Sequence, residues 1–292
     1  MSSRETTGLS PDLTTYLHQR RQAVDAALEA FLPPAAPTAT TSPTGLAAIH
    51  EAMRYAVLLG GKRMRPIITL AACEAAGGRT EQAMPAACAL ELVHAYSLVH
   101  DDLPAMDDDA ERRGRPTVHV AFGEATAVLV GDALLTQAFE VLTAPRDVTA
   151  DALVGCVRRL AHHAGTDGMV GGQGLDLAWG QGIDQLERLE RVHALKTGGL
   201  YAAAGAMGAL CSGASTAVVN QLERYGLAFG IAFQHADDVL DGDQIALREQ
   251  ALVRVDQLVD ECMTIAGSLA GGEPLVAIAK WVQTRAHNAI DD

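Results

Sequence analysis

Residues 81–109 read EQAMPAACALELVHAYSLVHDDLPAMDDD, an apolar stretch that closes on a cluster of aspartates. Residues 217–241, AVVNQLERYGLAFGIAFQHADDVLD, repeat the pattern and close on Asp237, Asp238 and Asp241. Apolar helices of this length are typical of the centre of a helical bundle. The two stretches therefore predict an all-α fold in which two core helices each carry carboxylates at one end.

Helical periodicity places the polar side chains of each stretch on one face. In residues 217–241, four fall at i, i+3, i+4 and i+7, namely Gln234, Asp237, Asp238 and Asp241. In residues 81–103, the positions i, i+3 and i+7 hold His94, Ser97 and Asp101. Side chains at these spacings are neighbours on an α-helix. Each helix is thus expected to present its carboxylates in one direction.

The rest of the chain is predicted to be helical as well, with Gly or Pro at most junctions. The further predicted helices cover residues 10–31, 45–59, 66–76, 118–142, 150–163, 186–193, 197–210, 245–269 and 274–289. No stretch shows sustained alternation of β-branched residues. Residues 33–44 form the one clear linker in the sequence, and it is too short and too early to divide domains. We expect one all-α domain over residues 1–292.

Composition excludes some classes of partner. Asp and Glu outnumber Lys and Arg by 36 to 22, which gives a formal charge of −14. A surface of this sign repels nucleic acid and anionic membranes, so neither is expected as a partner. No apolar run is expected to be long and uncharged enough to span a bilayer, and the N-terminus lacks a signal-peptide pattern.

The cysteines indicate a reducing environment. The chain has five, an odd number, widely spaced and without a C-x-x-C pair: Cys73, Cys88, Cys156, Cys211 and Cys262. Each lies in an apolar stretch and is expected to be a buried small hydrophobic residue. A cytoplasmic location follows as an expectation.

The aspartate clusters have two interpretations. Either cluster alone could be a solvated acidic helix end. Carboxylates at this density repel by several kcal/mol at about 4 Å and intermediate dielectric, so a shared, buried site would need cations. Oxygen ligands of this kind favour hard ions such as Mg²⁺. Because both clusters close apolar helices, we favour the metal site.

Basic motifs supply a third element. The run GGKRMRP begins at Gly60, RRGRP begins at Arg112, and KTGG begins at Lys196. Two of the three lysines in the chain, Lys62 and Lys196, lie in these motifs. A basic helix cap, a polar turn and an N-cap by Thr197 are the simpler explanations. Together with the aspartates, the motifs offer what a diphosphate needs: metal for one phosphate and Arg or Lys donors for the other. Lys196 is expected at a loop-to-helix junction.

Seven motifs in one order resemble a known family. GGKRMRP, DDLPAMD, RRGRPTVH, GDALL, GGQGLDL, KTGGLY and FQHADDVLD resemble the trans-isoprenyl diphosphate synthases (polyprenyl synthetases), most of all the bacterial farnesyl diphosphate synthase or geranyltranstransferase type. The resemblance covers about residues 45–241. It implies a single antiparallel helical bundle of the type I isoprenoid synthase fold around a deep central cavity. The N-terminal helix 10–31 and the linker 33–44 would be peripheral, and the protein a homodimer.

The resemblance also implies residue roles. The metal ligands would be Asp101, Asp102, Asp107, Asp237, Asp238 and Asp241, holding three Mg²⁺, or Mn²⁺ in their place. Allylic diphosphate would be gripped with the help of Arg112 and Lys196, and isopentenyl diphosphate by Lys62, Arg65, His94 and Arg113. The reaction centre would be lined by Gln173, Thr197 and Gln234, with Lys196, Thr197 and Gln234 steadying the carbocation.

The implied reaction is ionisation, condensation and elimination. The allylic diphosphate leaves, the isopentenyl double bond attacks the cation, and the released diphosphate removes a proton. This fits a chain without a Ser/His/Asp or Cys/His nucleophile arrangement. Tyr96 and Ser97, directly before the first aspartates, would form the floor of the tail pocket and stop growth at fifteen carbons, although Tyr96 could equally be a core residue.

One departure and three alternatives remain. The family has a long loop with a lysine after the second aspartate motif, whereas Gly242-Asp243-Gln244 here runs directly into a helix-like stretch in which only Arg248 could substitute. The alternatives are a geranyl or geranylgeranyl diphosphate synthase, a class I terpene cyclase and a low-activity partner subunit. The DDVLD motif and the presence of Lys62, Arg65 and Arg113 argue against the cyclase, and the six aspartates argue against the inactive subunit.

Overall fold

A computed structural model of the chain describes residues 9–34, 45–144, 146–179, 183–242 and 244–288. Most of the predicted linker, residues 35–44, lies outside these ranges, as do Asp243 and Ala289.

The helices are α1 (Pro11–Phe31), α2 (Leu46–Leu58), α3 (Met64–Ala75), α4 (Thr80–Asp101), α5 (Val118–Phe122), α6 (Glu124–Leu142), α7 (Ala150–Ala164), α8 (Met169–Trp179), α9 (Leu186–Val192), α10 (Gly199–Cys211), α11 (Thr216–Asp241), α12 (Arg248–Gly267) and α13 (Glu273–Asn288). A π-helical segment, His193–Gly198, joins α9 to α10, and a 3₁₀ turn, Ile245–Leu247, precedes α12. Within the described ranges, the only strands are β1 (Glu111–Arg112) and β2 (Arg115–Pro116), which form one short antiparallel hairpin.

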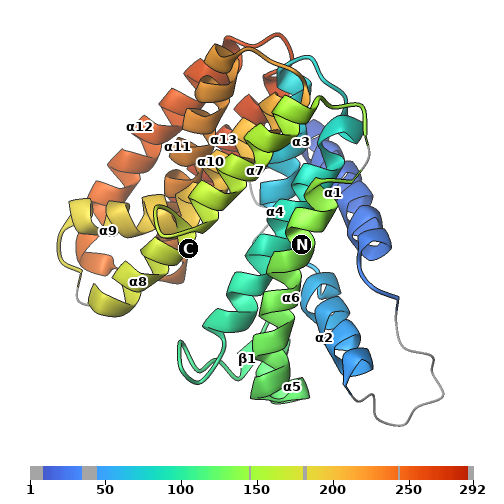
Figure 1. The fold of residues 1–292 in the computed structure, drawn as a ribbon. Helices are drawn as coiled ribbons and strands as arrows, with labels where there is room; N and C mark the ends of the chain where they lie inside the picture. Colours follow the sequence, from blue (N-terminus) through green and yellow to red (C-terminus); the bar gives the residue numbers. More distant parts are fainter. Residues whose placement is uncertain (1–8, 35–44, 145, 180–182, 243, 289–292) are drawn as a thin grey trace.

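The all-α prediction is confirmed, and the two quoted stretches become the central helices α4 and α11. One continuous hydrophobic cluster draws side chains from α1 to α8 and from α10 to α13. In Figure 1, α10, α11 and α12 (yellow to red) form one side of the molecule, and α4 and α6 (teal and green) run down the other. The lower end of α4 faces α8 and α9 across the molecule. The N-terminal helix α1, expected at the periphery, buries Leu13, Leu17, Val24 and Leu28 in the same cluster.

Glycines allow α10 and α11 to pack with their backbones in contact. A Cβ atom at Gly205 would lie 1.9 Å from the carbonyl oxygen of Leu222, and one at Gly226 would lie 1.9 Å from that of Tyr201. Both distances are far below van der Waals contact, so a side chain at either position would push the helices apart. At the other end of α11, Gly242 has a φ of 75°, the left-handed conformation that ends a helix. The chain therefore leaves the helix directly after Asp241.

Three predicted boundaries are wrong. Residues 118–142 are not one helix, because Gly123 (φ 89°) separates α5 from α6. Helix α8 was not predicted, because the glycines of GGQGLDL mask its helical character. The break predicted between the helices 186–193 and 197–210 is not a loop, because residues 193–198 form a π-helix that continues into α10. Lys196 therefore does not stand at a free helix N-terminus.

Helix α6 corrects a further expectation. By length and composition it is apolar enough to cross a membrane, with a mean hydropathy of 1.4. Of its apolar 18-residue window, 39% is buried inside the protein. Its inner face, including Ala127, Val130 and Leu134, belongs to the main core, where α6 packs against α4. Val128 and Leu129 on its outer face are exposed.

The prediction that the five cysteines are buried is confirmed, and all five are free thiols.

Candidate active site

Thr197 and Gln234 stand where three cavities meet, and both residues line all three. The Thr197 hydroxyl donates a hydrogen bond of 3.0 Å to the side-chain oxygen of Gln234. Thr197 comes from the π-helical segment and Gln234 from α11, so the contact joins the two elements at the centre of the molecule. The three cavities differ in the character of their walls: one is basic, one acidic and one largely apolar.

The basic cavity has a volume of about 730 Å³ and lies between α3, α4 and the β1–β2 hairpin. Its cationic lining consists of Arg21, Lys62, Arg63, Arg65, Arg112 and Arg113, with His94 beside them. The hairpin bends back because Arg113 and Gly114 both adopt positive φ, and Arg113 then donates to the carbonyl of Gly60. The structure therefore brings the GGKRMRP and RRGRP motifs together, with all four residues assigned to isopentenyl diphosphate on one wall.

The basic setting of this cavity favours the neutral form of His94. Burial lowers the pKa of His94 well below its usual value, and the nearby Arg65 and Arg113 lower it further. A neutral imidazole can donate one hydrogen bond to an anion without adding charge. Arg65 stacks over the ring of Tyr201, with its guanidinium carbon 4.7 Å from the ring centroid.

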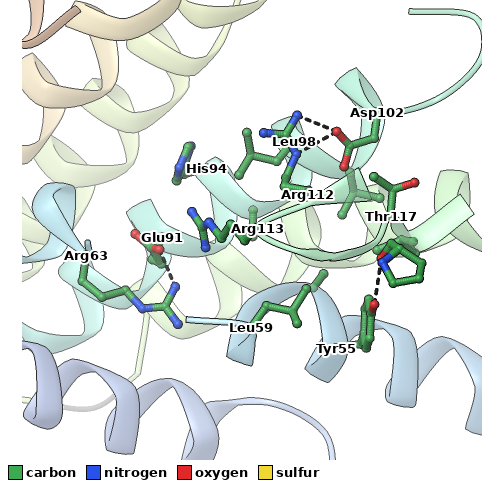
Figure 2. A pocket seen from close by; sticks show the side chains of 15 residues that line it. Tyr55, Leu59, Arg63, Glu91, His94, Leu98, Asp102, Arg112, Arg113 and Thr117 are labelled. Atoms are coloured by element: carbon green, nitrogen blue, oxygen red, sulfur yellow. Dashed lines mark hydrogen bonds and ion pairs between the residues drawn. The ribbon is translucent and has the colours of Figure 1, made fainter. Parts of the chain in front are cut away.

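Arg63 and Glu91, which line the basic cavity, belong to a buried ion-pair network; Figure 2 shows the pair of these two side chains. Arg63 donates to a carboxylate oxygen of Glu91 at 2.6 Å, to Asp25 at 2.8 Å and to the carbonyl of Val57 at 2.6 Å. The side chains of Arg63 and Glu91 are 3% and 6% exposed. Arg63 itself has a φ of 54°, a costly conformation that three partners from α1, α2 and α4 hold in place. The network fixes Lys62 and the start of α3, where Arg65 lies.

The acidic cavity has a volume of about 890 Å³ and is lined by Asp107, Asp176, Asp184 and Asp238, with His193 and Lys196. Asp107 follows α4, and Asp238 lies on α11. One aspartate from each predicted cluster thus faces the same space. Lys196 forms an ion pair with Asp176 at 2.5 Å.

The largely apolar cavity has a volume of about 460 Å³, in the range of small-molecule sites. Tyr96, Leu98, Met106, Met169, Val170 and Leu177 form most of its wall. Tyr96 is 8% exposed, and its ring meets His100 edge-on at 5.9 Å between centroids. Asp101, Lys196 and Gln173 mark its polar end. The predicted tail-pocket residues Tyr96 and Ser97 both line this space.

The three aspartates of the first cluster differ in their surroundings. Asp101 is half-buried, and burial raises its pKa to about 6, with Lys196 acting in the opposite direction. Asp102 is 3% exposed and accepts from Arg112 at 2.7 Å, away from the acidic cavity (Figure 2). Asp107 is exposed. Asp102 and Arg112, assigned to metal and allylic diphosphate respectively, are thus bonded to each other.

The second cluster is also divided. Asp237 forms ion pairs with Arg285 and, at 4.0 Å, with Lys62, on the basic side. Asp238 accepts from Gln234 at 3.0 Å and lies 3.1 Å from His193, on the acidic side. Burial acts to raise the pKa of Asp238, but these partners hold it below the usual value. Asp241 is exposed at the end of α11, and neither it nor Arg248 is among the residues lining the three cavities.

The donor set fits Mg²⁺. Asp101 is a carboxylate whose charged form burial disfavours, so a nearby cation would relieve it. Asp107 and Asp238 face one hollow with oxygen donors, which Mg²⁺ prefers, and leave room for water and phosphate ligands. Gln173, 8% exposed, has both amide atoms without a partner beside Asp101 and Lys196. These residues would hold the metals together with a bound diphosphate.

Several site residues were not predicted. Asp176 lies three residues after Gln173 in GGQGLDL, and this i, i+3 spacing on one helix face was the available signal. Arg285, on the terminal helix α13, pairs with Asp237 through tertiary packing that no local pattern reveals. His193 and His235 were not among the predicted site residues, and the centroids of their rings lie 4.6 Å apart, with His193 beside Asp238.

Comparison with known proteins agrees with this geometry. The polyprenyl synthetase family model matches residues 47–246. A geranylgeranyl diphosphate synthase of Cyanophora paradoxa is 47% identical over 232 residues, covering 79% of this chain and 74% of that protein. A dimethylallyltranstransferase of Fischerella ambigua is 46% identical over 242 residues, covering 82% of this chain and 66% of that protein.

Solved structures are also similar. The crystal structure of an FPP/GFPP synthase from Zymomonas mobilis superposes with a TM-score of 0.83 at 36% identity, covering 92% of this chain and 98% of that one. That of a geranyltransferase from Legionella pneumophila superposes with a TM-score of 0.80 at 33% identity, covering 95% and 98%. A bundle with basic, acidic and apolar cavities meeting at one point, and a family model spanning most of the sequence, lead to one conclusion. The chain belongs to the polyprenyl synthetase family of prenyltransferases.

Proposed function

We propose that this chain condenses isopentenyl diphosphate with dimethylallyl and geranyl diphosphates, in a Mg²⁺-dependent reaction that stops at farnesyl diphosphate. The observation that carries the proposal is the meeting of the three cavities at Thr197 and Gln234. One cavity suits a metal-free diphosphate, one suits a diphosphate with metal, and one suits a hydrocarbon tail. A reaction between two diphosphates that share an apolar product needs these three environments side by side.

The chain's own residues bind and orient the two substrates. Lys62, Arg65 and Arg113 offer cationic donors to the isopentenyl diphosphate, and neutral His94 adds one more. Lys196 lies at the polar end of the apolar cavity and faces the acidic cavity as well, so it can reach the allylic diphosphate. Bound Mg²⁺ would supply electrostatic stabilisation of the diphosphate as it leaves.

The junction of the cavities suits the reacting carbons. The bond between the allylic carbon and the diphosphate oxygen breaks, the isopentenyl double bond forms the new carbon–carbon bond, and one proton leaves to the released diphosphate. Thr197 and Gln234 place polar oxygen atoms at this point, and the apolar wall of Tyr96, Met169 and Leu177 would keep water from the cation.

Product length has two candidates. The position of Tyr96 in the wall of the tail cavity, where its ring packs against His100, supports a stop at fifteen carbons. The names of several relatives, geranylgeranyl diphosphate synthases at 43–48% identity, favour a twenty-carbon product. We retain farnesyl diphosphate as the proposal because the ring is built into the cavity itself.

We also propose a homodimer in the cytoplasm. The exposed apolar side chains Val128 and Leu129 on α6 support a self-association surface, since such a face is costly in water. Some relatives are named as subunits of heterodimers, so a related but different partner is the alternative. The five free, buried cysteines are compatible with a reducing compartment.

The direct test is product analysis. The purified chain is incubated with isopentenyl and dimethylallyl diphosphates and Mg²⁺, and the dephosphorylated products are identified by mass spectrometry. Farnesol as the main product supports the proposal, and geranylgeraniol moves the assignment to the second candidate. A cyclic hydrocarbon, or no condensation at all, overturns it. Chelation of Mg²⁺ should abolish turnover.

A further inference from the structure

We propose that the chain holds a second type of metal site, formed by His193, His235 and Asp238 with Glu190 beside them, that binds a divalent ion preferring nitrogen ligands, such as Zn²⁺ or Co²⁺. The site lies behind the wall of the acidic cavity. It is distinct in chemistry from the oxygen-rich Mg²⁺ site, although the two share Asp238. Binding to the site does not depend on the proposed prenyl transfer.

The geometry of the four side chains is compact. Ligand atoms of His193, His235 and Asp238 all lie within 4.8 Å of one another, the one such group among the described residues. His193 Nε2 is 3.1 Å from Asp238 Oδ2, and His235 Nε2 is 3.5 Å from Glu190 Oε1. Tetrahedral coordination with bonds of about 2.0–2.1 Å places ligand atoms about 3.3 Å apart. The two measured separations lie on either side of that value.

The spacing in sequence gives a second argument. Glu190 and His193 are three residues apart where α9 passes into the π-helix, and His235 and Asp238 are three residues apart on α11. Two facing helices thus each present one imidazole and one carboxylate from neighbouring turns. Helical bundles build metal sites from Glu-x-x-His pairs of this kind projecting inward from facing helices.

The buried imidazoles have nitrogen atoms without hydrogen-bond partners. His235 is completely buried, and neither of its ring nitrogens makes a hydrogen bond; its Nε2 lies 3.5 Å from Glu190. His193 is 5% exposed, with its Nε2 3.1 Å from Asp238 and its Nδ1 without a partner. Buried nitrogen atoms without partners are costly. A metal ion bound to the two Nε2 atoms would satisfy that nitrogen of His235 and would hold His193 and Asp238 as ligands. Glu190 also accepts from Arg254 at 2.7 Å, so it would act as the outer or fourth ligand.

The mixed donor set determines the class of ion. Two imidazoles with one or two carboxylates suit Zn²⁺ and Co²⁺, whereas Mg²⁺ prefers oxygen alone. An ion can enter from the acidic cavity, because His193 and Asp238 both line it. On the proposed function, occupancy would draw Asp238 away from Mg²⁺, and Zn²⁺ would then inhibit prenyl transfer.

Co²⁺ absorption tests the site without any assay of activity. The full-length chain, freed of metal and without substrate, is titrated with Co²⁺ in excess Mg²⁺, and the visible bands of four-coordinate cobalt are recorded. We expect one equivalent of Co²⁺ per chain and its displacement by Zn²⁺. His235→Gln and His193→Gln should each weaken Co²⁺ binding about tenfold or more. The control His163→Gln removes a histidine paired with Glu223 at 2.8 Å elsewhere and should leave the spectrum unchanged.

A second measurement uses no variant, so it still tests the site if the substituted proteins fail to fold. Crystals of the unaltered chain are soaked in Co²⁺, and anomalous scattering at the cobalt edge locates the ion. A peak within bonding distance of His193, His235 and Asp238 supports the site. Peaks confined to the aspartates, absorption typical of six oxygen ligands, or binding that survives both histidine substitutions would overturn it.

Discussion

Thr197 and Gln234 begin a short series of hydrogen bonds that ends at Asp238: the Thr197 hydroxyl donates to the Gln234 oxygen at 3.0 Å, and the Gln234 amide donates to Asp238 at 3.0 Å. These hydrogen bonds lead from the point where the three cavities meet to Asp238 in the wall of the acidic cavity. They fix the orientation of the Gln234 amide, because each of its two polar atoms has a defined partner. A change at Thr197 therefore affects the hydrogen bond that Asp238, on α11, accepts from Gln234.

Thr197→Val tests this connection. Valine keeps the shape of threonine and removes the donor, so Gln234 loses one of its two constraints. A lost hydrogen bond of about 1–1.5 kcal/mol corresponds to roughly tenfold lower turnover. Steady-state kinetics should show the loss in kcat. As a control, Thr264→Val removes a hydroxyl that bonds the Asp260 carbonyl within α12, where neither residue lines the three cavities, and turnover should hold. Equal losses in both variants would assign the effect to stability.

Asp101→Asn should abolish most activity without weakening the fold. The variant keeps the shape of the side chain and removes a charge that burial disfavours, so thermal unfolding should be unchanged or slightly higher. Turnover should fall by about 10²–10³-fold, the scale of losing one strong electrostatic contact to the transition state. Asp108→Asn is the matched control, since Asp108 is exposed in the loop that follows α4. Full turnover in the Asp101 variant would exclude its role in metal binding.

Glu91→Gln should destabilise the protein and weaken isopentenyl diphosphate binding together. Breaking a buried ion pair by removing one partner costs about 3–5 kcal/mol, here because Arg63 keeps its charge in the core. The segment that carries Lys62 and Arg65 then loses the contact between Arg63 and Glu91 that holds it in position, so KM for isopentenyl diphosphate should rise. Urea unfolding measures the first effect.

The exposed pair Arg79–Asp147 provides the comparison for Glu91. The Asp147 side chain is 83% exposed, and Asp147→Asn should cost about 0.5 kcal/mol or less. Similar losses in the two variants would mean that the Arg63 network contributes no more than a surface pair.

Tyr96→Ala should lengthen the product. Removing the ring opens the wall of the apolar cavity beside His100, so a growing tail meets no barrier there. Product chain length, measured by mass spectrometry, should shift by at least one five-carbon unit. Tyr55→Ala should not change it, because Tyr55 lines the pocket drawn in Figure 2 and does not line the apolar cavity. An unaltered product would remove Tyr96 from the control of length.

The sequence predicted the features that are encoded by patterns of neighbouring residues. Apolar runs ending in carboxylates gave α4 and α11, and the basic motifs gave the lining of one cavity, because both signals reside in contiguous residues. What it missed depends on packing between distant segments. The pairing of Arg285 with Asp237 joins α13 to α11, and the bond of Asp102 to Arg112 sets this aspartate apart from its neighbours. Neither follows from spacing.

Glycine was the other source of error. In GGQGLDL it lowers helix propensity, yet a Cβ atom at Gly172 would lie 2.2 Å from the backbone nitrogen of Lys196, so close packing requires glycine inside α8. At Gly123 the same residue type ends a helix, with a φ of 89°. Propensity alone does not separate these two uses, since only the tertiary contact distinguishes them.

The π-helical segment His193–Gly198 determines where this part of the chain can lose a residue. A π turn holds one residue more than the α turn that would replace it. Removing one residue of the segment, such as Leu195, would let an α turn replace the π turn and would keep the two flanks close to their present orientation, with His193 near Asp238 and the glycine face of α10 against α11. Removing one residue inside α10, such as Ala204, would instead rotate one flank by about 100° relative to the other. A single-codon deletion in the π-helical segment should therefore be less damaging than one inside α10.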